Sequence, residues 1–219
     1  MRKLFISAVL QLLVICAFAQ QQPRFFNDVQ TIKAYDKIYK TSPDPIVFVG
    51  SSSIRLWKNL HEVFGTYNVI NRGIGGGVTN DITFYLNDIV FPYQPRQIVI
   101  YVGENDLPSP ATTPDSVLNR TVRLFESIRA KLPQTPIVYI SMKPSPSREK
   151  FQQKAKEANN LIKEYISKQD KAVFVDVFPK MLAKDGKPNP KLFVKDMLHM
   201  NADGYAIWEK AVKPHLIKR

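Results

Sequence analysis

Cysteine and histidine are scarce in this chain of 219 residues, which carries one cysteine, Cys16, and three histidines. A single cysteine excludes an intrachain disulfide framework and a cysteine-based zinc cluster. Long apolar runs are missing after the first twenty residues, so we expect no membrane span in the rest of the chain. The charged share of 23% and the hydrophobic share of 44% are typical of a folded domain and disfavour disorder, collagen and coiled coil.

The first residues have the composition of a secretory signal peptide. A short basic start precedes an apolar run over 4–18, and a small-x-small pattern ends at Ala19. The run is shorter than the roughly 20 residues of a spanning helix. We therefore expect a signal peptide over 1–19, its cleavage, and a secreted or periplasmic protein. A lipoprotein modified at Cys16 is disfavoured, because Ile15 stands where a small residue is usual.

Five short apolar runs alternate with longer amphipathic segments. The runs predict strands at 46–49, 67–70, 97–102, 137–140 and 172–175. The amphipathic segments predict helices at 25–39, 116–131, 147–168 and 201–217. Such alternation is typical of an α/β fold with a parallel sheet. We expect one domain over 20–219, a three-layer α/β/α sandwich with a flavodoxin-like five-stranded sheet in the order 2-1-3-4-5.

Ligands of open α/β sheets bind at the carboxyl ends of the strands, and the unusual residues follow these ends. Ser51, Ser52 and Ser53 come after the first predicted strand. A serine at a strand-to-helix turn can expose its hydroxyl group as a nucleophile. Three serines can equally cap the next helix.

A glycine-rich block, Asn71 to Gly77, follows the second predicted strand. Glycines let a backbone amide approach a ligand closely. A dinucleotide fingerprint fails because Val78 stands where glycine is needed, and a P-loop fails because no Gly-Lys-Ser/Thr follows. A plain flexible turn remains an alternative.

The third block is Gly103-Glu104-Asn105-Asp106. Asn105 can offer a side-chain N–H to a developing negative charge, or it can form an Asx turn before Pro108. Glu104 and Asp106 could suggest a metal, but no histidine lies nearby in the sequence.

The fourth block is Asp196-Met197-Leu198-His199. An aspartate three residues before a histidine can accept a hydrogen bond from the imidazole and fix its tautomer. A metal site would need more ligands than this pair supplies. A capping aspartate beside a packed histidine is the structural alternative.

Together the four blocks supply a nucleophile, a base, an orienting acid and oxyanion donors, which are the groups of acyl transfer. Such chemistry needs no metal and no organic cofactor. Five residues near the blocks could also shape a pocket, and the sequence does not rank them: Trp57, Asn71, Arg72, Glu104 and Lys143.

The order of the blocks resembles the SGNH hydrolases, the GDSL-type esterase/lipase family, and within it the branch with platelet-activating-factor acetylhydrolase catalytic subunits. The resemblance spans 46–217. It implies Ser52, Asp196 and His199 as catalytic residues, and an oxyanion hole formed by Ser52, Gly76 and Asn105.

One position departs from the family pattern, because Ser51 stands where the name GDSL has aspartate. The acid is supplied by Asp196, so the chemistry need not fail, although Ser51 or Ser53 could also be the nucleophile. The chain lacks the Gly-x-Ser-x-Gly elbow of α/β-hydrolases.

We therefore expect a serine-dependent carboxylic ester hydrolase for short acyl groups, on O-acetylated carbohydrates or small lipid esters. The alternative is a catalytically inactive glycan- or lipid-binding protein on the same fold. The net charge of +12 and the lysines of 141–171 suggest a polyanion-binding surface as a further alternative. We favour a solvated helix face instead, and we expect no nucleic-acid partner. The sequence leaves the oligomeric state open.

Overall fold

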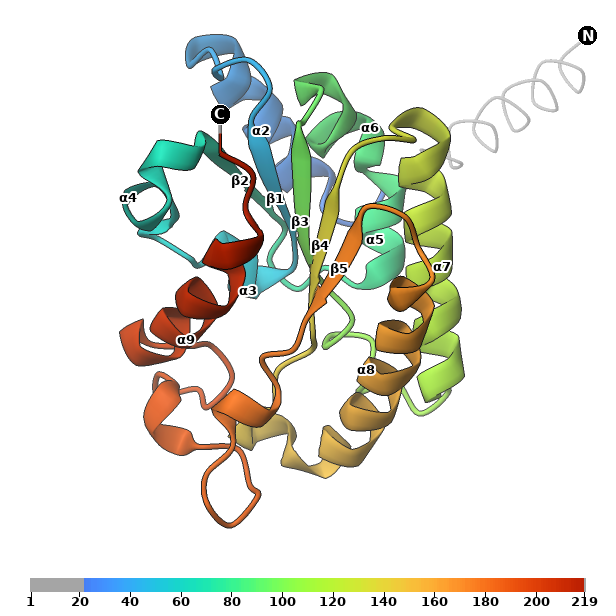
Figure 1. The fold of residues 1–219 in the computed structure, drawn as a ribbon, viewed down its shortest axis with the longest axis vertical. Helices are drawn as coiled ribbons and strands as arrows, with labels where there is room; N and C mark the ends of the chain where they lie inside the picture. Colours follow the sequence, from blue (N-terminus) through green and yellow to red (C-terminus); the bar gives the residue numbers. More distant parts are fainter. Residues whose placement is uncertain (1–21, 219) are drawn as a thin grey trace, which may run out of the picture.

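The computed structural model describes residues 22–218 and contains a five-stranded parallel sheet in the order β2-β1-β3-β4-β5 (Figure 1). Neighbouring strands pair in parallel throughout. The sheet and its strand order are thus confirmed. The expected signal peptide over 1–19 and Cys16 lie outside the described residues. The strands are β1 (Ile46–Gly50), β2 (Val69–Gly73), β3 (Gln97–Tyr101), β4 (Ile137–Ile140) and β5 (Ala172–Val175).

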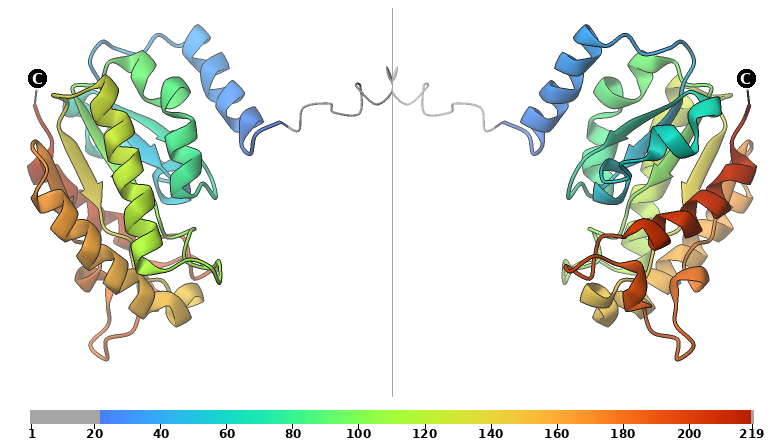
Figure 2. Two further views of the ribbon diagram at one scale, coloured as in Figure 1. Left: turned by 90° about the vertical axis from the view of Figure 1, so that its right-hand side faces the viewer. Right: turned by 90° about the vertical axis from the view of Figure 1, so that its left-hand side faces the viewer.

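Helices cover both faces of the sheet and complete the three predicted layers (Figures 1 and 2). Side chains of each central strand alternate between two cores: Val47 and Val49 pack under α5, α7 and α8, while Ile46 and Phe48 pack under α3 and α9. Within residues 22–218, no helix reaches the length and hydropathy of a membrane-crossing segment. The helices are α2 (Phe26–Ile38), α3 (Ser52–Arg55), α4 (Leu60–Val63), α5 (Thr79–Phe84), α6 (Leu86–Ile89), α7 (Pro114–Lys131), α8 (Gln152–Ser167) and α9 (Ala202–Val212).

Two predicted helices were too long. The helix expected at 147–168 splits into a 3-10 segment, Pro146–Phe151, and α8, because Arg148 leaves helical geometry with φ of −120°. The helix expected at 201–217 ends at Val212, since Pro214 cannot donate the next backbone hydrogen bond. Asn201 caps its start, with the side-chain oxygen accepting from the Gly204 amide at 3.1 Å.

The second strand begins later than predicted, at Val69 rather than 67. Tyr67 belongs to a 3-10 turn, and Asn68 adopts left-handed geometry with φ of 47°. The strand then continues to Gly73, which pairs with Gly50. This extension brings the glycine-rich block directly beside the serines that follow β1.

Candidate active site

The turn after β1 exposes one serine of three. Gly50 has φ of 144°, and a Cβ there would lie 1.8 Å from the Tyr101 carbonyl oxygen, so only glycine fits. Ser51 and Ser53 are each 2% exposed, whereas Ser52 between them is partly exposed. The structure therefore presents Ser52, and neither neighbour, to the surface.

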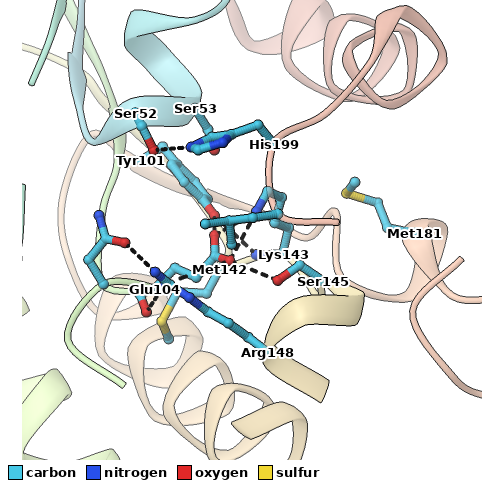
Figure 3. Close-up of polar contacts among 12 residues, drawn as sticks. Ser52, Ser53, Tyr101, Glu104, Met142, Lys143, Ser145, Arg148, Met181 and His199 are labelled. Carbon is cyan, nitrogen blue, oxygen red and sulfur yellow. Dashed lines mark hydrogen bonds and ion pairs between the residues drawn. The ribbon is translucent and has the colours of Figure 1, made fainter. Parts of the chain in front are cut away.

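His199 faces Ser52 from the other end of the chain, as Figure 3 shows. Its Nε2 lies 2.9 Å from Ser52 Oγ, and its Nδ1 lies 2.6 Å from Asp196 Oδ2. Met197, with φ of 55°, turns the chain back so that acid and base meet. The three predicted catalytic residues thus form one continuous hydrogen-bonded row.

The Asp196 carboxylate is held in its charged form. Oδ1 accepts backbone N–H bonds from Leu198 and His199, both at 2.9 Å, while Oδ2 faces the imidazole. Desolvation opposes ionisation, but these hydrogen bonds outweigh it and lower the pKa of Asp196 to about 2. An ionised Asp196 keeps a proton on Nδ1 and leaves Nε2 free to accept one from Ser52.

The glycine-rich block curls beside Ser52. The Ile74 amide donates to the Gly50 carbonyl at 2.7 Å, and Gly76 adopts φ of 79°. Among residues 22–218, nothing accepts a hydrogen bond from the Gly76 amide. Ser52 is the first residue of α3, so its amide also lacks an intrahelical acceptor.

Asn105 is oriented by contacts on both ends of its amide. Nδ2 donates to the Gly77 carbonyl at 3.1 Å, and Oδ1 accepts from Arg148 Nη2 at 2.8 Å. A primary amide has two N–H donors. One hydrogen of Nδ2 therefore remains for a ligand beside the glycine-rich block.

Arg148 was not predicted as a site residue, because in the sequence it is one basic residue in a lysine-rich segment. Its Nη1 also donates to the Glu104 carbonyl at 2.6 Å, so one guanidinium group binds two consecutive residues of the third block. Its side chain reaches them because residue 148 breaks helical geometry. A planar guanidinium with paired donors suits such a clamp.

A buried charge network supports this clamp (Figure 3). Lys143 Nζ contacts the two Glu104 oxygens at 2.7 and 3.0 Å, Ser145 donates at 3.1 Å, and Tyr101 donates to the same carboxylate. Burial opposes ionisation of Glu104, but Lys143 and Arg148 outweigh it and lower the pKa of Glu104. Glu104 and Lys143 are thus supporting groups below the site and do not line it.

The other residues that the sequence did not rank also serve the framework. Trp57 is 1% exposed and stacks on Tyr205 with ring centroids 5.3 Å apart. Asn71 donates to the Ile54 carbonyl at 2.6 Å, tying β2 to α3. Arg72 pairs with Asp36 of α2.

Asp106 likewise serves the framework, because it anchors the start of α5, just after the glycine-rich block. Its Oδ2 accepts from the Thr79 amide and hydroxyl at 3.0 and 3.1 Å, and its Oδ1 accepts from Arg120 at 2.7 Å. The described part of the chain contains no group of three potential metal ligands.

The sequence profile of the GDSL-like Lipase/Acylhydrolase family matches residues 47–207. No curated protein gives a significant match. A Streptococcus pneumonia protein provisionally described as a platelet activating factor is 25% identical, with 96% of this chain and 99% of that chain covered and a TM-score of 0.74.

Two further solved structures share the fold. A GDSL-like lipase from Bacteroides thetaiotaomicron is 22% identical, with 86% of this chain and 96% of that chain covered and a TM-score of 0.72. An acetylxylan esterase from Geobacillus stearothermophilus is 15% identical, with coverages of 81% and 96% and a TM-score of 0.64.

Proposed function

The chain belongs to the GDSL-like lipase/acylhydrolase family and is a hydrolase, and on this premise we propose that it cleaves short-acyl carboxylic esters through an acyl-enzyme formed on Ser52. The observation that carries the proposal is the row Ser52–His199–Asp196. His199 lies 2.9 Å from Ser52, which is 147 residues away in the chain, and 2.6 Å from Asp196. Such a row matches the geometry by which a base activates a serine.

In the first half-reaction, His199 Nε2 takes the proton of Ser52 as Oγ attacks the ester carbonyl carbon. Asp196 stabilises the imidazolium ion that results. The imidazolium then protonates the oxygen of the leaving alcohol, and the acyl group stays on Ser52. In the second half-reaction, a water molecule gives a proton to His199 and attacks the acyl carbon. The imidazolium then returns that proton to Ser52 Oγ as the bond between Oγ and the acyl carbon breaks and the acid leaves.

Three hydrogen-bond donors stabilise the negative charge on the oxygen of the tetrahedral intermediate. These are the backbone amides of Ser52 and Gly76 and the free N–H of Asn105. The proposal is supported by the Gly76 amide, which has no acceptor within the described residues, and by the two-sided fixation of Asn105. Donors held in place before the reaction stabilise developing charge at little reorganisation cost.

We further propose that the protein works outside the cytoplasm, after removal of residues 1–19, on O-acetylated carbohydrates or small lipid esters. The sequence offers no long apolar insertion that could hold a fatty tail. Turnover of p-nitrophenyl esters from acetate to decanoate tests the acyl preference. We expect acetate to be cleaved fastest, and faster cleavage of decanoate would contradict a short-acyl site.

A fluorophosphonate probe tests the mechanism directly. We expect the chain from Gln20 to gain one adduct, on Ser52, and the variant His199→Ala to gain none. His215→Gln is the matched control, since His215 is exposed and lies outside the site. An adduct on Ser51 or Ser53 would move the nucleophile. A folded protein that takes no label would favour the non-catalytic binding alternative.

A further inference from the structure

A groove runs along α2 toward the glycine-rich block and ends at Arg55 and Gly73. It consists of two adjoining hollows of about 580 and 410 Å³, which share Ile32, Tyr35, His61 and Asn71. One wall is α2, and the other is the outer edge of β2. The ion pair of Asp36 with Arg72 joins α2 to β2, which forms the edge of the sheet.

Arg55 stands where the groove meets the active site. A Cβ built on Gly75 would lie 2.6 Å from Nε and from Nη2 of Arg55, so the guanidinium group lies flat against the backbone next to Gly76. Within the described residues, no carboxylate pairs with Arg55, although Asp28 lines the same hollow. A guanidinium with open donors beside the reacting ester favours an anionic group on the substrate.

Two tyrosines line the far part of the groove. Tyr35 and Tyr39 are 59% and 66% exposed, and their rings lie nearly parallel, 23° apart, with centroids 6.1 Å from each other. The two stacked rings form one exposed aromatic cluster about one helical turn long. Sugar rings pack their C–H faces on such surfaces and leave their hydroxyl groups at the rim.

The rest of the lining mixes apolar side chains, such as Ile32 and Val69, with polar and charged groups that can bind a hydrated ligand. Within the described residues β2 pairs only with β1, so part of its outer backbone edge faces the groove and can bind hydroxyl groups. Two groups of that edge already have partners, because Arg72 donates to the Asn71 carbonyl and the Gly73 amide donates to the Asn71 side chain. The Asp36 carboxylate is neutralised by Arg72. Lys40 and Lys58 add positive charge along the walls.

We propose that this groove binds the glycan chain of an O-acetylated acidic oligosaccharide, with a uronate carboxylate on Arg55 and sugar rings on Tyr35 and Tyr39. The inference rests on the proposed function, because it supplies the alcohol half of the ester that Ser52 would attack. The neighbouring hollows place an extended chain along α2, with the acetylated sugar at the catalytic end.

Kinetics with paired substrates test the inference. The substrates are a partly O-acetylated oligogalacturonide, a partly O-acetylated xylo-oligosaccharide of equal length, and p-nitrophenyl acetate. We expect wild-type protein to prefer the acidic oligosaccharide, with a KM that rises with salt because screening weakens the contact with Arg55. We expect the double variant Tyr35→Ala/Tyr39→Ala to lose about tenfold in kcat/KM for both oligosaccharides relative to p-nitrophenyl acetate.

Arg55→Gln should remove the preference for the acidic chain. Ile38→Ala is the matched control, because Ile38 is 71% exposed on the same helix but does not line the groove. We expect this control to behave as wild type. Equal loss on all three substrates in the tyrosine variant, or a preference for the neutral oligosaccharide, would overturn the inference.

Binding to the inactive variant Ser52→Ala separates this inference from the proposed function. Calorimetric titration with the same acidic oligosaccharide should give binding that the tyrosine substitutions weaken, even if no ester is ever cleaved. Ester cleavage without oligosaccharide binding would keep the function and refute the groove. A tyrosine variant that changes only the sedimentation coefficient would reassign the surface to contact with a second copy of the chain.

Discussion

At the scale of single residues, Arg148 connects the framework to the proposed chemistry. It donates to Asn105 Oδ1 and to the Glu104 carbonyl through separate nitrogens. It touches no reacting atom, and its contribution is the direction in which the Asn105 amide points. A shift of that amide would weaken the stabilisation of the oxyanion more than the binding of the uncharged ester.

A double-mutant cycle tests this positioning role. Asn105→Ala should lower kcat by about 10²–10³. Arg148→Ala should lower kcat by about tenfold with little change in KM, and should add almost nothing in the Asn105→Ala background, because its effect acts through that side chain. Esterase kinetics measure all three variants. Additive losses would show that Arg148 acts by another route, and Lys156→Ala on exposed α8 surface is the control.

Residue identities could be predicted from the sequence where short blocks carried them, and the structure explains where they could not. Three consecutive serines look alike in the sequence, whereas in the structure Ser51 and Ser53 are buried and Ser52 contacts His199. Trp57 lies close to the blocks in sequence, yet it packs in the core. Arg148 carries no local signal, since its partners lie 43 and 44 residues away.

At the scale of elements, the ends of β3 and β4 are joined by the buried pair of Glu104 and Lys143. The pair fixes the position of the third block, Gly103 to Asp106, relative to the sheet. Because removal of one partner leaves the other buried and unpaired, such pairs are costly to break. The folded state favours ionised Glu104, so its contribution is present above the ordinary pKa of 4.5 and is lost as pH falls through the lowered value.

The variant Glu104→Gln should therefore lower the free energy of unfolding at pH 7 by about 3–5 kcal/mol. The difference from wild type should shrink as pH falls below 4.5. Urea unfolding followed by tryptophan fluorescence at several pH values measures this. A difference that stays constant or grows in acid would refute the linkage. Glu62→Gln, at an exposed glutamate of α4, should show no such trend.

The five strands and the four longer helices, α2, α7, α8 and α9, could be predicted because their apolar periodicity extends over several turns or a whole buried strand. The short helices α3 to α6 went unpredicted, since four to six residues are too few to display a helical period. Helix ends were misjudged at Arg148 and Pro214, where tertiary contacts and a missing amide override the amphipathic pattern.

At the scale of the whole molecule, one sheet separates two cores. Both tryptophans, Trp57 and Trp208, belong to the core under α3 and α9. The two long helices α7 and α8 cover the opposite face. Since every central strand contributes side chains to both cores, we propose that residues 20–219 unfold as a single unit.

Two optical probes test this cooperativity. Tryptophan fluorescence reports one core, and circular dichroism at helical wavelengths reports mainly the helices on the other face, of which α7 and α8 are the longest. We expect the two urea transitions to coincide, as for a single domain of this size. Two resolved midpoints would divide the chain into separate folding units.

Leu182 and Pro188 pair as an isolated antiparallel bridge, and the hairpin tip between them, at 184–187, is exposed. This tip lies between the serine and its base in the chain. A cut at that tip would leave Ser52 on one fragment, and Asp196 with His199 on a second, shorter fragment that carries α9. Trp208 is completely buried against the larger fragment, so it would provide apolar contact area that holds the two fragments together. The protein thus has the layout of a split reporter, in which ester cleavage would register the meeting of two polypeptides.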